Sequence, residues 1–262
     1  MHPYRALCVL LALATPGCGT VQDGPAPADG PGGSDPTPAD GPSGADPATA
    51  CIGQPFPNAA PPVLTFSGRF IDAHDGSPVP SAILRLVHGS TDVAGSAADA
   101  DGRYGTEVAT GGNAVDVRME LIAVSQGYIP QTIHPSRPFT GDQVDRTLGL
   151  SNDARMQLLY GGSSATWDGT AAYIAIKIVD CAGTGIAHAQ IVATPVGGIR
   201  RYFRPIDDPD AADTDESGIV EILNQPPGSV TITATAPAPF TQLRTYTIAV
   251  GANTIHDLDI QP

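Results

Sequence analysis

Closely spaced carboxylates are the first candidates for chemistry in this sequence. The run Asp99-Ala100-Asp101-Gly102 looks like the start of a calcium loop. An EF-hand would need an oxygen ligand where Ala97 stands and a glutamate where Val108 stands. We therefore interpret the run as a tight turn, in which Asp99 accepts backbone N–H groups and Gly102 supplies a positive φ.

Two denser acidic clusters lie at 207–210 and 213–216. Solvated acidic loops are commoner than Ca²⁺ sites, and the scattered histidines lack the spacing of a zinc site. The sequence also lacks a Gly-x-Ser-x-Gly elbow, a Walker loop and a dinucleotide fingerprint. We therefore predict no metal, no cofactor and no catalytic residue. A hydrolase whose Ser, His and Asp meet only in space stays open as an alternative.

Cys18 is the candidate for covalent modification. It follows Arg5 and an apolar run from 6 to 14, which has the length of a signal-peptide h-region. A small residue followed by cysteine at this point is typical of a bacterial lipobox, in which the thiol is acylated. Gly19 at the next position matches default sorting to the outer membrane. The alternative is an ordinary cleaved signal and a soluble secreted protein.

The remaining cysteines predict a disulfide. Cys8 leaves with the signal peptide, so Cys51 and Cys181 remain in the exported chain. Two cysteines in an oxidising compartment usually pair. A Cys51–Cys181 bond would join the end of a stalk to the first strand of a second module. Two free buried thiols are the alternative.

A few side chains are candidates for ligand binding. Trp167 is the sole tryptophan, and an exposed indole can stack on a sugar; packing of an inter-module linker is the other interpretation. Arg200, Arg201 and Tyr202 form a basic and aromatic cluster in an acidic chain. Such a cluster is either a partner-binding loop or an edge strand protected by its charges.

The charge balance excludes one class of partner. The net charge is −14, the pI is about 4.5, and Lys177 is the only lysine. Nucleic-acid binding rewards basic patches, so we expect no nucleic-acid partner. From 19 to 62 the chain has no Lys or Arg and carries a loose Asp-Gly-Pro repeat. Such a segment cannot bury enough surface to fold, which predicts a solvated stalk.

Beyond the stalk, the pattern is that of short strands. Residues 116–121 and 230–235 alternate between polar and apolar, and Ile174, Ile176 and Ile178 share one face of another run. Period-2 runs separated by Gly and Pro turns predict a β-sandwich or barrel. Only residues 152–160 favour a short helix, ended by glycines.

An internal repeat divides this β region. Each half has a strand ending in Asp, a glycine turn, a small residue, and an Asp-x-x-Gly turn. The corresponding segments are Phe70–Asp72, Gly76–Ala82 and Asp99–Tyr104 in the first half, and Ile178–Asp180, Gly183–Ala189 and Asp215–Val220 in the second. Each half spans about ninety residues, near the size at which a sandwich core becomes self-sufficient.

These motifs resemble the carboxypeptidase regulatory-like (transthyretin-like) domain family. The matching positions are Gly76, Pro78, Val79, Ala82, Asp99, Asp101, Gly102, Tyr104, Gly127 and Tyr128, then Gly183, Ile186, Ala189, Asp215, Gly218, Pro227 and Gly228. The resemblance covers roughly 63–150 and 171–262 and implies prealbumin-like sandwiches that usually serve as accessory domains. The second half lacks the Asp-Gly pair and the tyrosine, and 200–212 resembles an insertion.

We therefore expect an all-β protein with two tandem prealbumin/Ig-like sandwiches. The predicted divisions are a signal peptide (1–17), a lipid-anchored disordered linker (18–62), a first sandwich (63–150), an inter-module linker (151–170) and a second sandwich (171–262). The predicted function is a non-catalytic cell-surface lipoprotein with a structural or binding role. Its expected partners are the membrane, through the anchor, and an envelope protein or polysaccharide. A carbohydrate-binding accessory protein and the cryptic hydrolase are the alternatives.

Overall fold

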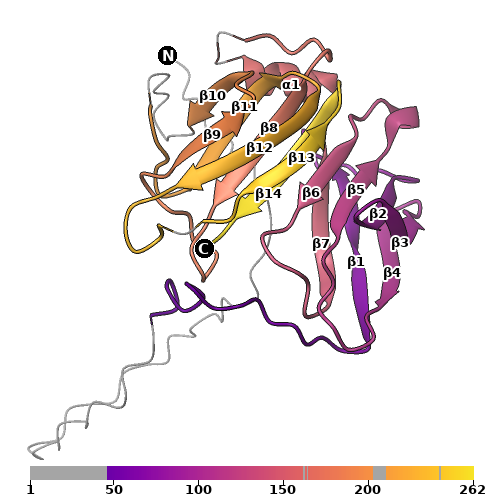
Figure 1. The fold of residues 1–262 in the computed structure, drawn as a ribbon. Coiled ribbons are helices and arrows are strands. Elements are labelled where there is room, and N and C mark those ends of the chain that lie inside the picture. The colour runs from indigo at the N-terminus through magenta and orange to yellow at the C-terminus, as the bar shows by residue number, and fades with distance from the viewer. Residues whose placement is uncertain (1–45, 162, 164, 203–210, 242) are drawn as a thin grey trace, which may run out of the picture.

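The computed structural model describes residues 46–161, 163, 165–202, 211–241 and 243–262. These residues form an all-β protein made of two β-sandwiches (Figure 1), and one α-helix, α1 (Asp153–Tyr160), follows the first sandwich. The predicted signal peptide, Cys18 and most of the predicted stalk lie outside the described residues.

Module 1 is the sandwich built from the first seven strands. They are β1 (Val63–Asp72), β2 (Ile83–His88), β3 (Thr91–Ala97), β4 (Arg103–Ala109), β5 (Arg118–Ile122), β6 (Gln131–His134) and β7 (Gln143–Leu150). One layer has the order β4-β1-β7, and the other has the order β3-β2-β5-β6. A short 3-10 turn, η1 (Val124–Gln126), lies between β5 and β6.

Module 2 repeats this topology. Its strands are β8 (Ala172–Ile178), β9 (Gln190–Thr194), β10 (Ile199–Tyr202), β11 (Ile219–Gln225), β12 (Gly228–Thr235), β13 (Tyr246–Val250) and β14 (Thr254–Ile260). As β1 does with β4 and β7, β8 pairs antiparallel with β11 and parallel with β14. The antiparallel series β2-β5-β6 likewise corresponds to β9-β12-β13. One strand differs, because β3 pairs with β2 whereas β10 pairs with β11.

The glycines of the two Asp-x-x-Gly turns occupy equivalent places. Gly102 and Gly218 have φ of 76° and 68°, which a residue with a Cβ adopts only at a cost. A Cβ at Gly102 would lie 2.5 Å from the oxygen of Phe70, and one at Gly218 would lie 2.2 Å from that of Ile178. The repeat seen in the sequence is therefore a repeat in three dimensions, with glycine required where the turn meets the first strand.

A continuous eight-stranded sheet joins the modules. Its order is β10-β11-β8-β14-β6-β5-β2-β3, and the boundary is the parallel pair β14–β6. Within this pair Ile255 is opposite Gln131 and Leu258 is opposite His134. Each module therefore contributes four strands to one hydrogen-bonded sheet (Figure 1).

The two halves of this sheet carry their second layers on opposite faces. Leu258 and Ile260 of β14 pack in the core of module 2, whereas Ile255 packs in a cluster beneath α1. Ile133 of β6 packs in the core of module 1 and is register-paired with Asp257, which shares a face of β14 with Ile255. The β4-β1-β7 layer and α1 thus cover one face, and β13-β12-β9 covers the other.

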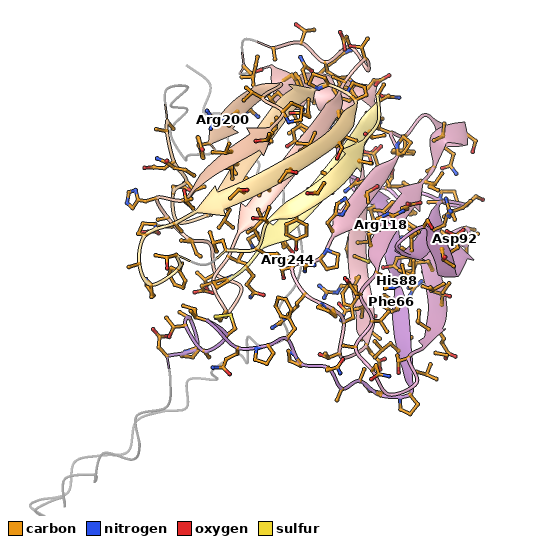
Figure 2. All side chains as sticks on the ribbon, in the orientation of Figure 1. Phe66, His88, Asp92, Arg118, Arg200 and Arg244 are labelled. Carbon is orange, nitrogen blue, oxygen red and sulfur yellow. A yellow bond between two sulfur atoms is a disulfide. The ribbon has the colours of Figure 1, made fainter. Side chains whose placement is uncertain are left out.

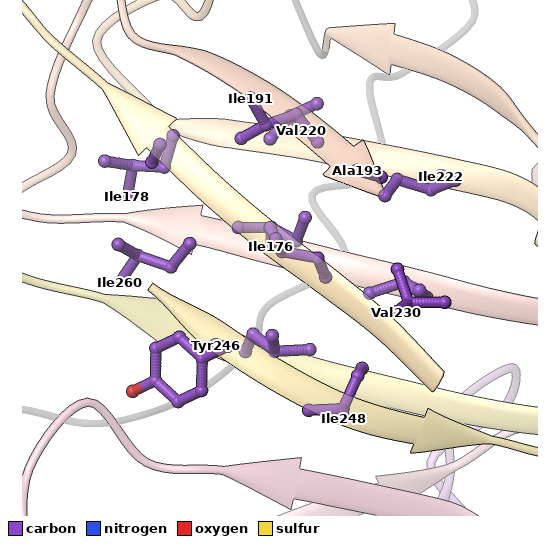
Figure 3. Packing of buried hydrophobic residues seen from close by; sticks show 14 of the residues in the cluster. Ile176, Ile178, Ile191, Ala193, Val220, Ile222, Val230, Tyr246, Ile248 and Ile260 are labelled. Atoms are coloured by element: carbon purple, nitrogen blue, oxygen red, sulfur yellow. The ribbon is translucent and has the colours of Figure 1, made fainter. Parts of the chain in front are cut away.

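Alternation of side chains explains the cores. In β8, Ile174, Ile176 and Ile178 point into the core of module 2, where they meet residues such as Val230 and Ile248 (Figure 3). The intervening Tyr173 and Ala175 point to the opposite face, under α1. Both faces of β8 are buried, which is why this strand reads as a nearly continuous apolar run.

Residues 46–62 form a strap along the base of both modules (Figure 1). Near one end, Cys51 is bonded to Cys181 of module 2, and the N–H of Cys181 donates to the oxygen of Ala48 at 3.1 Å. Toward the other end, the N–H of Ala114 in module 1 donates to the oxygen of Asn58 at 2.9 Å. This last part of the predicted solvated linker is therefore held against the folded body by a disulfide and by backbone hydrogen bonds.

Candidate functional site

A groove lies between the outer edge of β13, which is paired with no strand among the described residues, and the outer face of module 1. Its volume is about 340 Å³, and its lining comes from the ends of β2 and β6, the starts of β5 and β13, and the residues beside them. The lining residues are Val87, His88, Gly89, Asp116, Val117, Arg118, His134, Pro135, Arg244, Tyr246, Thr247 and Ile248. Both modules contribute, so the β14–β6 joint sets the width of the groove.

Arg244 is held in place on the module 2 side. Its guanidinium lies 4.8 Å from the ring centroid of Tyr246 and 5.9 Å from that of Phe56 in the strap. One Nη donates to the oxygen of Ser136 at 2.8 Å. A guanidinium carries five donors, so this arrangement fixes the cation and leaves donors for a ligand.

Arg118 supplies the cation on the module 1 side. Its Nε and one Nη donate to Glu120 at 3.1 and 2.9 Å, and the other Nη donates to the oxygen of Gly89. Glu120 also lies 3.2 Å from Arg85. Figure 2 shows Arg118, Arg244 and His88 around the groove.

Three histidines lie in or beside the groove, and they differ in burial. His88 is exposed, and its Nδ1 lies 2.6 Å from the oxygen of Asp116, so Nδ1 carries the proton. His134 stacks on His256, with Nε2 and Nδ1 3.3 Å apart. Burial lowers the pKa of His134 to about 3, and His256 and Arg118 add to this effect. Burial, assisted by Arg118, lowers the pKa of His256 to about 4, so this pair is neutral at pH 7.

Two buried carboxyl groups lie on the opposite face of β14. Burial raises the pKa of Asp257 to about 7, although a hydrogen bond from Gln131 opposes this effect. Burial also raises the pKa of Asp259 to about 6, against the charges of Lys177 and Arg146. Both groups therefore hold protons at a pH where an exposed aspartate is ionised.

The predicted sugar-stacking candidate, Trp167, is buried. Its ring packs against Tyr160 with centroids 5.7 Å apart, and its Nε1 donates to Asp153 at 2.9 Å. Trp167 therefore holds α1 against the sheet, as the linker-packing interpretation expected. Its ring face is not presented to solvent.

The basic and aromatic cluster is largely engaged within module 2. Arg201 donates from Nε to Glu221 at 2.8 Å and from an Nη to the oxygen of Leu159 at 3.0 Å. Tyr202 is buried. Arg200 is exposed and donates to the oxygen of Ile191 at 2.7 Å. These residues belong to β10, an edge strand, and their ligand-binding role stays a prediction.

The predicted disulfide is confirmed. Cys51 and Cys181 are bonded, with their Cα atoms 5.4 Å apart. The tight turn at Asp99 is also confirmed, since Asp99 accepts the N–H groups of Asp101 and Arg103 at 2.9 and 2.8 Å.

Neither a metal cluster nor a spanning helix is found in the described residues. They contain no group of three or more His, Cys, Asp or Glu side chains that could hold a metal ion. The acidic cluster at 207–210 lies outside them. None of the described helices is long and apolar enough to cross a membrane.

No protein-family profile matches the chain, and no curated protein sequence is similar to it. Among solved structures it is similar to the Bacillus anthracis TIE protein, at 13% identity and a TM-score of 0.27. The match covers 76% of this chain but only 34% of that protein.

Two pilins are similar at the same level. The GBS52 minor pilin of Streptococcus agalactiae has 10% identity and a TM-score of 0.26, with 76% of this chain and 94% of that one covered. The SpaA shaft pilin of Lactobacillus rhamnosus GG has 10% identity and a TM-score of 0.24, with 76% and 97% covered. Likeness at this level carries no conclusion about function.

The groove residues were not singled out from the sequence. His88, Arg118, His134 and Arg244 lie far apart along the chain and carry no motif. A weak signal did exist, because the 13 Lys and Arg residues are outnumbered by 27 Asp and Glu, and Arg118 lies within the predicted strand 116–121.

Proposed function

We propose that this protein is a non-catalytic, lipid-anchored component of the cell envelope that displays a rigid pair of carboxypeptidase regulatory-like modules. The observation that carries the proposal is the eight-stranded sheet that crosses the module boundary. Tandem domains usually move relative to one another unless their interface is large. Here three features connect the two modules: a hydrogen-bonded strand pair, the disulfide-linked strap and the packing of α1. Such a body suits display of a fixed binding surface.

The equivalence of the modules supports the family part of the proposal. Asp72 ends the first strand and accepts from the N–H of His74 at 2.6 Å and from the hydroxyl of Tyr128 at 2.9 Å. Asp180 takes the same place in module 2 and accepts from the N–H groups of Ala182 and Thr184, both at 2.9 Å. The Asp after the first strand thus closes the following glycine turn in both modules.

Distance measurement between spin labels tests the rigid body. Val93 of β3 and Val192 of β9 are exposed and lie in different modules. Spin labels on a Val93→Cys/Val192→Cys variant should give a distance distribution as narrow as labels on Val93→Cys/Val144→Cys, which lie within module 1. A distribution much broader than this control would contradict the proposal.

The anchoring part needs a separate test. The intact mass of the protein from native membranes should begin at Cys18 and include acyl chains. Because a buried CH₂ contributes about 0.8 kcal/mol, several chains hold a protein firmly to a bilayer. An unacylated N-terminus in the culture medium would instead establish a secreted soluble protein and reject the anchor.

A further inference from the structure

The internal repeat exposes a difference between two equivalent strand edges. β6 and β13 hold the same position in their modules, as the last strand of the antiparallel series. The outer edge of β6 is paired with β14, in parallel. In the described part of the chain, β13 is paired with β12 alone, so its equivalent edge has no strand beside it. An unpaired edge presents a row of backbone N–H and C=O groups that can pair with another chain.

The groove described above runs along this edge of β13. Its volume, about 340 Å³, lies at the lower end of the range for ligand pockets. The apolar groups of Val87, Val117 and Ile248 line it together with the two guanidinium groups. A strand added to β13 here would have one face toward Arg118 and the outer surface of module 1, because side chains alternate along a strand.

Charge selects the occupant. Arg118 and Arg244 both line the groove, but Arg118 is ion-paired with Glu120. Arg244 is held by the oxygen of Ser136 and by two aromatic rings, so its guanidinium is the one that offers its charge to a ligand. This guanidinium lines a groove of a chain whose net charge is −14. The strand that fills the equivalent place at β6 is β14, which carries aspartates on alternate positions, Asp257 and Asp259. Burial raises their pKa values in the folded protein, whereas the same side chains in a free peptide are ionised at pH 7.

We propose that the groove binds an extended, carboxylate-bearing peptide segment of another exported protein, which adds as a parallel strand to the free edge of β13. Backbone pairing supplies the affinity, and the guanidinium group of Arg244 selects a carboxylate on the added strand. This site deepens the proposed display function and rests on it, because the rigid joint keeps the groove at a fixed width.

A synthetic peptide with the sequence of residues 254–260 is the probe, labelled for fluorescence anisotropy and titrated with the oxidised protein. We expect saturable binding, and about tenfold weaker binding to Arg244→Ala, the effect of losing one charged hydrogen bond of about 1.4 kcal/mol. Arg103→Ala is the matched control, because Arg103 is an exposed arginine outside the groove, and it should bind as the wild type does.

Two modified peptides separate backbone pairing from charge. A peptide N-methylated at alternate residues keeps both carboxylates but loses the donors of one edge, and it should bind at least about tenfold more weakly. A peptide with both Asp replaced by Asn should also bind more weakly. Hydrogen exchange at 246–250 should slow when the unmodified peptide is bound.

Absence of saturable binding at millimolar peptide would overturn the proposal, as would binding that neither N-methylation nor Arg244→Ala weakens. The spin-label experiment separates this failure from failure of the display function. A narrow inter-module distance without peptide binding would leave the rigid display module standing and remove only the peptide site.

Discussion

Asp257 is a buried acid whose ionisation opposes folding. Its pKa is about 7 in the folded protein against 3.8 when exposed, mainly because of burial. The folded chain therefore binds a proton more tightly than the unfolded chain does. The contribution of protonated Asp257 to the free energy of unfolding is fully present below about pH 4 and is lost as the pH rises through about 7.

Asp257→Asn removes this dependence, because the amide keeps the shape of the protonated acid without titrating. We expect the variant to gain about 2–3 kcal/mol relative to the wild type between pH 5 and pH 8, at 1.36 kcal/mol for each pKa unit. Urea unfolding at both pH values measures the difference. An equal difference at pH 5 and pH 8 would show that Asp257 does not titrate with a raised pKa.

The histidine pair acts in the opposite direction. The pKa values of His134 and His256 are about 3 and 4 in the folded protein against 6.5 when exposed. The contribution of the two neutral imidazoles to the free energy of unfolding is present above about pH 6.5 and is lost as the pH falls through about 4. We expect a His134→Gln/His256→Gln variant to lose less stability than the wild type between pH 6.5 and pH 4. Urea midpoints across this range provide the test, and parallel curves would contradict the expectation.

At the scale of elements, the contact between β1 and β7 depends on a glycine. A Cβ at Gly68 would lie 1.9 Å from the backbone oxygen of Arg146, whereas a Cβ at Gly105 on the neighbouring β4 would have nothing nearer than Ser67, at 4.0 Å. A backbone oxygen cannot rotate away as a side chain can. We expect Gly68→Ala to destabilise the protein by about 3 kcal/mol or more and Gly105→Ala to cost less than about 1 kcal/mol.

Urea unfolding of the two alanine variants measures this contrast. The second glycine is a matched control because both residues lie in adjacent, paired strands of module 1. Equal free energies of unfolding for the two variants would mean that β7 can shift away from β1 without cost. The close approach of these two strands would then not require a glycine at position 68.

Much of this element structure could be predicted from the sequence. Alternation located β5, β8 and β12, and the repeated Asp and Gly positions identified two modules with one topology. Asn152 caps α1 through a hydrogen bond from the N–H of Arg155 at 3.0 Å, at the helix start that the sequence indicated. These features depend on local periodicity and turn chemistry, which one sequence displays.

The joint and the groove could not be predicted in the same way. β6 has only four residues, Gln-Thr-Ile-His. An alternating pattern of this length is too short to predict a strand. Its parallel partner β14 lies more than a hundred residues away, and the partner is chosen by tertiary packing rather than by local pattern. Arg118 and Arg244 line the same groove only because this pairing forms, so the site is a consequence of the joint.

At the scale of the whole molecule, the disulfide closes a large loop. Cys51 and Cys181 are separated by 130 residues, so the bond restricts the unfolded chain strongly. We expect Cys51→Ser/Cys181→Ser to lower the free energy of unfolding by roughly 3–5 kcal/mol. Thermal melting should show the same loss for the reduced wild type. An unchanged melting temperature in both would mean that the strap and the sheet already fix the modules without the bond.

The position of this bond also determines where tension enters the molecule. A pull on the chain before Cys51, resisted by module 2, passes through the sulfur atoms to the end of β8. Module 1 lies entirely within the loop that the disulfide closes, so this pulling force does not pass through it. Shear from flowing liquid or a moving surface would load the base of module 2, while module 1 and its face of the groove would keep their shape.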